Sequence, residues 1–227
     1  MTRKTSGIQA VIFDFDGTLA ELNLDFGLMQ RRLGALAGAF LEEVPESDGL
    51  PVLEWLDVLA QRIGSRDTAT GLEFHSRGRL LITAMELEAA RTGRLFPDTR
   101  EILALLLAAK LKVGIITRNS TAAVKNVFPD IERCCDTFLA RDSVPRPKPD
   151  PAHVKAALDR LGVEAAKALV VGDHPIDVQT ARRAGCLSGA VASGNMSLEE
   201  LAGHSPDFLA RDCKELVAGL QSKKLLP

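Results

Sequence analysis

The sequence predicts a doubly wound parallel α/β sheet with a small inserted helical domain. Short apolar, β-branched runs recur along the chain, as expected of strands buried on both faces. Helical patterns separate these runs, and this alternation builds parallel sheets. One helical stretch is too long to be a loop or a simple crossover. The predicted strands are Ile8–Phe13, Lys112–Thr117, Ala168–Val171 and Leu187–Ala192.

The first predicted strand has clear limits on both sides. Gly7 precedes the apolar run, and the turn signal Asp16–Gly17 follows it. Aspartate and glycine favour tight turns, so the strand should end shortly before them. Two acidic residues therefore stand where a buried strand leaves the core.

A helical insertion is expected directly after this strand. From about residue 22 to residue 94 the apolar residues follow a helical period, as in residues 80–90, with no convincing strand. We therefore expect a helical cap domain over residues 21–94. The α/β core would then consist of residues 1–20 and 95–227, which suits a chain of 227 residues with one main core.

Two helices are expected between the later strands. Pro97–Lys110 carries proline in its first turn, where a missing N–H costs no helical hydrogen bond. The segment Asp150–Gly162 has an N-cap aspartate, a proline at the next position and a terminal glycine. Both patterns are typical of helices that connect strands of a parallel sheet.

Composition and charge narrow the possible partners. The net charge is -2 and the sequence pI is about 6.1, so the chain lacks the basic surplus of nucleic-acid and anionic-membrane binders. We expect neither of these partners. Any anionic ligand must be held by local groups.

Targeting and zinc-binding patterns are missing from the sequence. The four cysteines show neither CxxC spacing nor paired histidines, which argues against a zinc site. The N-terminal apolar stretch is too short for a signal peptide, and no apolar run approaches the roughly 20 residues of a membrane span. The expected location is the cytoplasm.

Polar residues follow the predicted strands, at the edge where parallel sheets bind their ligands. Together they supply carboxylates, a hydroxyl group and an ammonium group. This set suits phosphoryl transfer, in which a nucleophile, a divalent cation and fixed positive charge act on an anionic phosphate. The candidates are Asp14, Asp16, Thr117, Lys148, Asp173 and Asp177.

Each residue type has a chemical part in such a site. Asp14 and Asp173 could share a Mg²⁺ ion, which prefers carboxylates and water as ligands. Lys148 would offset the remaining negative charge. The hydroxyl group of Thr117 can donate to a phosphate oxygen, and backbone N–H groups near residues 118–120 can hold an anion.

In this order the motifs resemble those of the haloacid dehalogenase superfamily of phosphatases. Residues 14–18, DFDGT, resemble its first motif, and the strand that ends in Thr117 resembles the second. Lys148 resembles the third motif, and residues 172–177 resemble the fourth. The early helical insertion is most similar to the phosphoglycolate phosphatase and β-phosphoglucomutase branch. The resemblance implies a Rossmann-like core with an inserted helical cap.

The resemblance also implies catalytic and metal-binding roles. Asp14 would be the nucleophile that forms an aspartyl-phosphate, and Asp16 would protonate the leaving alkoxide and later deprotonate water. Mg²⁺ would be held by Asp14, by the backbone carbonyl of Asp16 and by Asp173, with Asp177 supporting these ligands. Lys148 would complete the catalytic group.

A phosphate-binding group is implied as well. Arg118 would contribute its backbone N–H, and Thr18 would orient Asp16 within the same site. His174 departs from the family pattern, which commonly has a small hydroxyl residue there, and its role is left open. The implied phosphate- or substrate-binding residues are Thr18, Thr117, Arg118, Asn119 and Lys148.

The expected function is a Mg²⁺-dependent phosphatase that acts on a small phosphorylated metabolite. The resemblance implies that Asp16 favours phosphate esters over haloacids, because the dehalogenases that gave the superfamily its name lack this second aspartate. A phosphomutase of the β-phosphoglucomutase kind is the first alternative, and a non-catalytic regulator that binds a phosphorylated ligand is the second. The substrate and the oligomeric state stay open.

Overall fold

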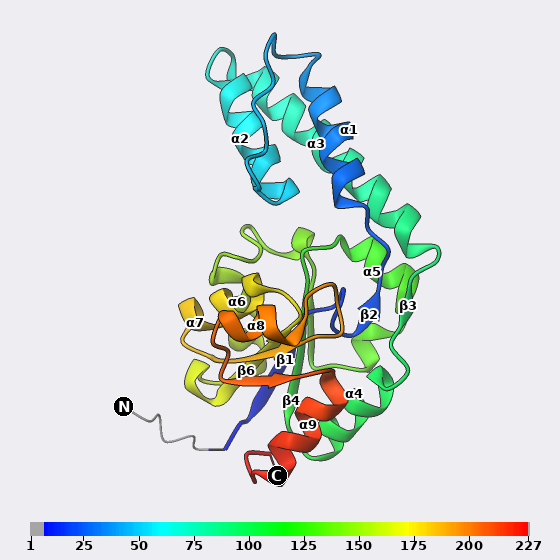
Figure 1. The fold of residues 1–227 in the computed structure, drawn as a ribbon, viewed down its shortest axis with the longest axis vertical. Helices are drawn as coiled ribbons and strands as arrows, with labels where there is room; N and C mark the ends of the chain where they lie inside the picture. The colour runs from blue at the N-terminus through cyan, green and yellow to red at the C-terminus, as the bar shows by residue number, and fades with distance from the viewer. Residues whose placement is uncertain (1–6, 227) are drawn as a thin grey trace. The chain divides into compact units, whose positions relative to one another are not determined.

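The computed structural model describes residues 7–226, and its main unit contains a six-stranded parallel sheet. The strand order is β5-β4-β1-β6-β7-β8 (Figure 1). Helices connect the strands, so the predicted α/β class is confirmed. The strands are β1 (Ala10–Phe13), β4 (Lys112–Ile116), β5 (Thr137–Leu139), β6 (Ala168–Gly172), β7 (Leu187–Val191) and β8 (Phe208–Ala210).

All four predicted strands are present as β1, β4, β6 and β7. In the centre of the sheet, Ile12 of β1 pairs with Gly114 of β4 on one side and with Val170 of β6 on the other. The connections reverse direction across β1, because the chain first builds β4 and β5 on one side and then β6 to β8 on the other. Ligands of open α/β sheets bind at such a switch point, beyond the carboxyl ends of the strands.

Helices of the main unit pack against the strands that they connect. α6 packs on β4 and β5, and α7 packs on β6 and β7. α4 contacts β4, and α9 contacts β7 and β8. These helices are α4 (Thr99–Ala108), α5 (Thr121–Val127), α6 (Ala152–Leu161), α7 (Pro175–Ala184), α8 (Leu198–Gly203) and α9 (Cys213–Ser222), with short 3-10 turns η1 (Ile131–Arg133), η2 (Arg141–Ser143) and η3 (Ala165–Lys167).

The helix predicted from Pro97 begins two residues later, at Thr99. The Oγ1 of Thr99 donates to the carbonyl of Leu19 at 2.6 Å, which fixes the helix start against the turn after β1. The helix predicted over residues 150–162 is α6. Gly162 ends it in the left-handed conformation with φ of 66°, as expected of a C-terminal glycine.

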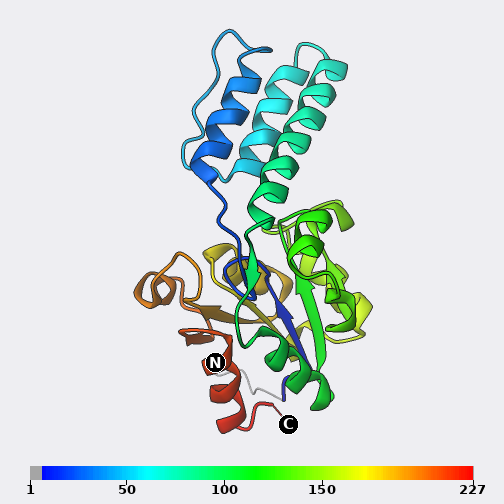
Figure 2. The same ribbon diagram turned by 90° about the vertical axis from the view of Figure 1, so that its right-hand side faces the viewer.

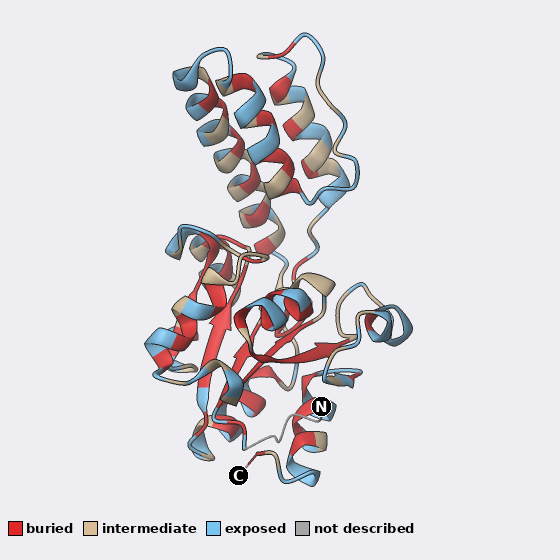
Figure 3. Ribbon diagram, turned by 90° about the vertical axis from the view of Figure 1, so that its left-hand side faces the viewer, coloured by how far each residue is buried: buried red, intermediate tan, exposed pale blue. Residues whose placement is uncertain are grey.

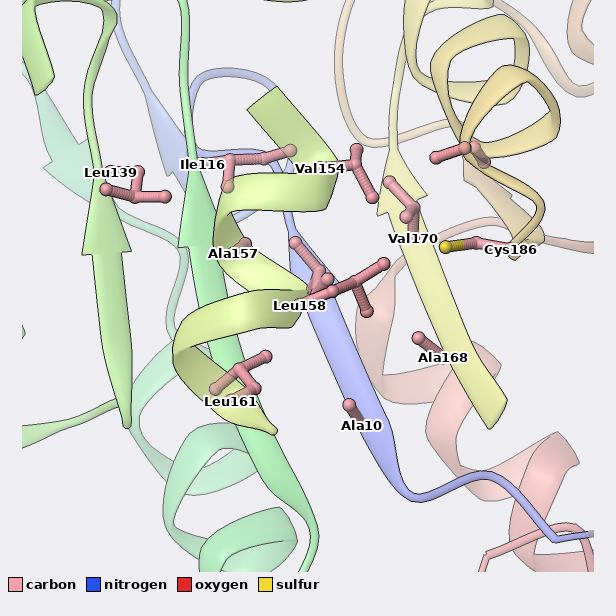
Figure 4. Packing of buried hydrophobic residues seen from close by; sticks show 13 residues of the cluster. Ala10, Ile116, Leu139, Val154, Ala157, Leu158, Leu161, Ala168, Val170 and Cys186 are labelled. Carbon is pink, nitrogen blue, oxygen red and sulfur yellow. The ribbon is translucent and has the colours of Figure 1, made fainter. Parts of the chain in front are cut away.

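Alternate residues of β1 face the helices α6 and α7. Ala10 and Ile12 share one buried cluster with Leu158 of α6 and Val170 of β6 (Figure 4). Successive strand residues point to opposite faces, so Val11 and Phe13, which are also buried, belong to the other face of the sheet. The first strand is therefore enclosed on both sides, which explains its uninterrupted apolar run.

The contacts between residues divide the chain into two compact units, Met1–Leu22 with Ala90–Pro227 and, separately, Asn23–Ala89. The second unit contains α1 (Phe26–Ala37), α2 (Val52–Gly64) and most of α3 (Thr68–Ala90), which lie side by side (Figure 2). Buried and exposed residues alternate along these helices (Figure 3). Their shared core includes Met29, Leu33, Trp55, Leu56, Leu59 and Phe74.

A short antiparallel pair, not predicted from the sequence, joins the two ends of the insertion. β2 (Ala20–Glu21) pairs with β3 (Arg94–Leu95), and both strands belong to the main unit. Arg94 also pairs with Glu21 at 2.8 Å. Within residues 7–226, no helix, including the 23-residue α3, combines the length and the apolar character needed to cross a bilayer.

Candidate active site

The carboxyl edge of the sheet gathers the acidic candidates from separate elements. Asp14 directly follows β1, Asp173 directly follows β6, and Asp177 lies in the first turn of α7. One carboxylate oxygen from each of these residues lies within 4.8 Å of the others. The side chain of Asp16 is not a member of this group.

The crowding of carboxylates changes their protonation. Burial, followed by the negative charges of Asp14, Asp177 and Asp16, raises the pKa of Asp173 to about 8. Burial also raises the pKa of Asp14 to about 6, although Lys148 acts in the opposite direction. The group is therefore short of positive charge.

Lys148 lies between two of these acids. Its Nζ is 2.9 Å from Oδ1 of Asp14 and 2.6 Å from Oδ1 of Asp177, and only 1% of its side chain is exposed. Burial alone would lower the pKa of Lys148, but the two carboxylates raise it above its ordinary value. The ammonium group stays charged and balances part of the acidic group.

A tight turn holds the residues that follow β1. The carbonyl of Phe15 accepts hydrogen bonds from the N–H groups of Leu19 and Ala20, and Gly17 has a φ of 76°. Such a backbone conformation favours glycine. The N–H of Leu22 donates to Oδ1 of Asp16 at 3.0 Å, which fixes this carboxylate beside the turn.

Thr18 has a contact that differs from the one predicted. Its Oγ1 donates to Oδ1 of Asp173 at 3.2 Å, across 155 residues of sequence, and its side chain is buried. The hydroxyl group therefore steadies an acid of the fourth motif. The role of Thr18 in orienting Asp16 stays a prediction.

The loop after β4 contains Thr117, Arg118 and Asn119, which are called the phosphate seat here after the role predicted for them. Thr117 is buried, and its Oγ1 accepts the N–H of Asn119 at 3.1 Å. The Nδ2 of Asn119 is also buried and has no hydrogen-bond partner among the described residues. A buried donor without a partner is costly, so this amide suits an acceptor supplied by a ligand.

The family of haloacid dehalogenase-like hydrolases matches residues 8–185, a range that holds all four motifs. The match covers more than half of the chain and begins at β1. The chain belongs to this family. Its fold, with the acids and Lys148 gathered at the carboxyl edge of the sheet, is the fold of a haloacid dehalogenase-like hydrolase.

Relatives of this haloacid dehalogenase-like hydrolase cover nearly its whole length. The chain is 29% identical to a phosphoglycolate phosphatase of Photorhabdus laumondii over 235 residues, which covers 96% of each protein. It is 27% identical to the pyrophosphatase PpaX of Bacillus velezensis over 216 residues, which covers 92% of this chain and 95% of that protein. The family match and these relatives support a phosphatase hydrolase.

A solved structure gives the same fold. The structure of a hydrolase from Pseudomonas syringae aligns with a TM-score of 0.70 and 25% identity, covering 94% of this chain and 98% of that one. The likeness therefore extends beyond the sheet to the helical insertion. Both parts of the haloacid dehalogenase-like hydrolase have counterparts in one known structure.

The acidic group of this haloacid dehalogenase-like hydrolase fits a divalent cation. Three carboxylates converge there, Lys148 contributes one positive charge, and the pKa of Asp173 stays well above its ordinary value. Hard cations such as Mg²⁺ and Ca²⁺ take oxygen ligands of this type. The oxygen set does not by itself distinguish one such ion from another.

His174 begins α7 as its N-cap. Its Nδ1 accepts the N–H of Ile176 at 3.2 Å, while Oδ2 of Asp177 accepts the N–H of His174 at 3.3 Å. This reciprocal pair is a capping box, in which histidine takes the place of the usual hydroxyl residue. Asp177 therefore caps the helix and joins the acidic group at the same time.

Three contributors to the site were not predicted. His153 is fully buried, and its Nδ1 accepts the N–H of Lys148 at 3.2 Å. The Oγ of Ser193 donates to the carbonyl of Gly17 at 2.7 Å. A Cβ atom at Gly194 would overlap Oδ2 of Asp173, so the glycine leaves room for this carboxylate.

Sequence signals for these contributors are weak. His153 shares a four-residue spacing with the buried residues Ala157 and Leu161 of α6, which could have indicated burial. Ser193 and Gly194 follow β7 at the carboxyl edge, where ligand-binding loops occur, but serine and glycine are common in any loop.

Proposed function

We propose that the chain is a Mg²⁺-dependent phosphatase that hydrolyses a small phosphorylated metabolite through an aspartyl-phosphate intermediate. One observation carries this proposal. Asp14 stands at the end of the central strand, with Nζ of Lys148 2.9 Å from its Oδ1 and with carboxylate oxygens of Asp173 and Asp177 within 4.8 Å. A carboxylate nucleophile needs such a setting, because an anionic phosphate would otherwise be repelled.

The proposed reaction has two displacement steps at phosphorus. In the first, a carboxylate oxygen of Asp14 attacks phosphorus while the bond to the ester oxygen breaks, and Asp16 gives its proton to that leaving oxygen. In the second, Asp16 takes a proton from water as the water oxygen attacks phosphorus. The bond between phosphorus and the Asp14 oxygen breaks in this step, inorganic phosphate leaves, and Asp14 and Asp16 return to their starting states.

Lys148 and the phosphate seat would hold the substrate during both steps. Lys148 keeps its charge next to Asp14 and reduces the repulsion between the nucleophile and the phosphate. The Thr117 hydroxyl, the Arg118 amide and the Nδ2 of Asn119 would donate to the phosphate oxygens. The buried Nδ2 without a partner supports this assignment.

The cation would be held by Asp14, Asp173 and the backbone carbonyl of Asp16, with Asp177 next to them. When bound, it would offset negative charge on the carboxylates and on the phosphate. Asp177 is already shared with Lys148 and with the cap of α7. We therefore assign it a supporting place beside the ligands.

We take the substrate class from the named relatives. The phosphoglycolate phosphatase and the pyrophosphatase make 2-phosphoglycolate and inorganic pyrophosphate the first candidates. We propose that the helical insertion, residues 21–94, acts as a cap that selects among such substrates. A panel that adds a sugar phosphate and a nucleoside monophosphate would rank them by kcat/KM.

The central test is hydrolysis of p-nitrophenyl phosphate with Mg²⁺ and with EDTA. We expect Asp14→Asn to abolish turnover, because the amide is not a nucleophile. Asp159→Asn, the same chemical change at an exposed position of α6, is the matched control and should keep full activity. Full activity in Asp14→Asn would overturn the proposal.

A second variant separates the two acids. Asp16→Asn should lower kcat by about 10²–10⁴ for an alkyl phosphate, the usual contribution of a general acid. The loss should be smaller for p-nitrophenyl phosphate, whose leaving group needs less protonation. Acid-quenched Asp16→Asn should also carry a phosphoryl group on Asp14 in its mass spectrum, since Asp16 is needed to activate water.

A further inference from the structure

Arg141 is a deeply buried cation that no predicted motif includes. It begins the short turn η2, directly after β5, and only 2% of the residue is exposed. Arginine is almost never buried to this extent unless its donors are used. Its Nη1 donates to the carbonyl of Arg118 at 3.0 Å, and its backbone N–H donates to the carbonyl of Asn119 at 3.1 Å.

These two hydrogen bonds fix consecutive peptide planes of the phosphate seat. In a planar trans peptide, the carbonyl of one residue and the N–H of the next point in opposite directions. Because Arg141 holds the carbonyl of Arg118, the N–H of Asn119 is directed away from the guanidinium group. That N–H donates to Oγ1 of Thr117 at 3.1 Å.

The orientation of the Thr117 hydroxyl follows from this arrangement. Its oxygen accepts the N–H of Asn119, so its own proton cannot point along that line. The proton is left to donate to another acceptor. Arg141 therefore acts on the hydroxyl of Thr117 through one peptide plane, without any need for direct contact.

The neighbouring residue holds the other end of the loop. The carboxylate of Asp142 accepts the N–H of Thr121 at 3.1 Å and also its hydroxyl group. Asp142 is exposed, so water competes for these hydrogen bonds, whereas Arg141 is shielded from water. The buried contact should therefore contribute more than the exposed one.

We propose that Arg141 is a positioning residue for phosphate binding, which acts through the backbone of Arg118 and Asn119. This inference rests on the proposed function, because it assigns the phosphate to the loop after β4. Arginine suits the task since its planar guanidinium is always charged and presents its donors in a fixed geometry. A lysine would supply a point charge on a different stem.

The test compares phosphate affinity with stability. Inorganic phosphate is used as a competitive inhibitor of p-nitrophenyl phosphate hydrolysis, in the full chain with Mg²⁺. We expect Arg141→Met to raise the inhibition constant for phosphate and KM by at least about tenfold, the lower range for loss of a hydrogen bond to a charged group. The value of kcat should fall by less, and Arg141→Lys should be intermediate.

Two controls separate positioning from loss of stability. Leu158→Ala removes a buried side chain of α6 and should lower the thermal midpoint without changing the inhibition constant. Arg160→Met makes the same chemical change at an exposed position and should change neither quantity. An inhibition constant that rises equally in Leu158→Ala and Arg141→Met would overturn the proposal.

Each remaining outcome also decides the matter. If Arg141→Met does not fold, an unchanged inhibition constant in Arg141→Lys would overturn the role of Arg141. The role of Arg141 would also be overturned if the wild-type protein is active and both Arg141 variants bind phosphate as tightly as the wild type. If the wild-type protein neither hydrolyses the ester nor responds to phosphate, the proposed function fails first and this inference fails with it.

Discussion

The Nζ of Lys148 lies 2.9 Å from Oδ1 of Asp14, and both side chains are largely shielded from solvent. A buried ion pair gains little over an apolar pair, but removal of one partner leaves an uncompensated charge. The lysine is therefore needed even before any substrate is bound. Its charge offsets that of the acidic residue that follows the central strand.

Lys148→Met should destabilise the protein more at pH 8 than at pH 5. At pH 8 the variant must bury ionised Asp14, which should cost about 3–5 kcal/mol. At pH 5 the carboxyl group can take up a proton, because loss of Lys148 removes the influence that lowers its pKa. Urea unfolding at both pH values measures the difference, with exposed Lys155→Met as control. An equal loss at both pH values would contradict this account.

In the metal-free protein, the contribution of Asp173 to the free energy of unfolding should fall as the pH rises. Its folded pKa is about 8, above the ordinary value of 3.8. A carboxyl group with a raised pKa contributes stability below its unfolded pKa, and this contribution is lost as the pH rises through the folded pKa. The unfolding free energy of Asp173→Asn, relative to wild type, should therefore increase by several kcal/mol between pH 4 and pH 8.

Mg²⁺ should reverse that loss in the wild-type protein. Cations bind ionised carboxylates and displace protons, so binding strengthens as the pH rises. Millimolar Mg²⁺ should raise the thermal midpoint of the wild-type protein more at pH 8 than at pH 5, and should have little effect on Asp173→Asn. A thermal midpoint that Mg²⁺ leaves unchanged at both pH values would count against a metal site.

Gly194→Ala should weaken Mg²⁺ activation without unfolding the protein. The added Cβ would overlap Oδ2 of Asp173 and push this carboxylate out of the acidic group. We expect the Mg²⁺ concentration for half-maximal activity to rise by roughly 10–100-fold, the usual effect of losing the support of a metal ligand. Activity titrations with MgCl₂ measure it.

Gly219→Ala provides the matched control for this change. Gly219 lies inside α9, and a Cβ there would meet no atom within 4 Å. Alanine should stabilise the helix by about 0.5–1 kcal/mol. The Mg²⁺ requirement should stay unchanged. If both variants shift it equally, overlap with Asp173 is not the cause.

His153 should make the fold sensitive to mild acid. Burial, followed by the charge of Lys148, lowers its pKa to about 4. A histidine with a depressed pKa takes up a proton more readily when unfolded, so the folded state loses stability as the pH falls from about 6.5 towards 4. The loss should be roughly 2–4 kcal/mol for a shift of this size.

His153→Gln is expected to remove most of this acid sensitivity. Glutamine can accept the N–H of Lys148 and donate to the carbonyl of Leu139, as the histidine does, but it does not titrate. Urea unfolding from pH 7.5 to pH 4.5 would compare the slopes of wild type and variant. A steeper slope in the variant would show that the histidine is not the titrating group.

The inner part of the sheet was predictable because its strands are buried on both faces. β1 and β6 therefore appear as uninterrupted apolar runs, and β4 and β7 as mainly apolar ones. The edge strands β5 and β8 have only three residues each and are partly exposed, so they lack this signal. The pair of β2 and β3 has two residues per strand and depends on contacts between distant segments.

For the site, the sequence indicated which side chains would meet but not what supports them. Asp14, Asp173 and Lys148 follow from the rule that the carboxyl ends of parallel strands share one edge. Their chemical roles remain predictions. The contacts of Arg141 and Ser193 could not be predicted, because each depends on a backbone carbonyl whose direction is set only by the folded loops.

The position of β1 has a consequence for biosynthesis. β1 leaves the ribosome before the other strands of its sheet, and the two strands that pair with it begin only at Lys112 and Ala168. Until they emerge, both edges of this apolar strand lack a hydrogen-bonding partner. The helices of Asn23–Ala89 can fold by then, because they form a separate core. Such exposed strands invite aggregation, so the nascent chain should depend on chaperones most during synthesis of the residues between the insertion and β6.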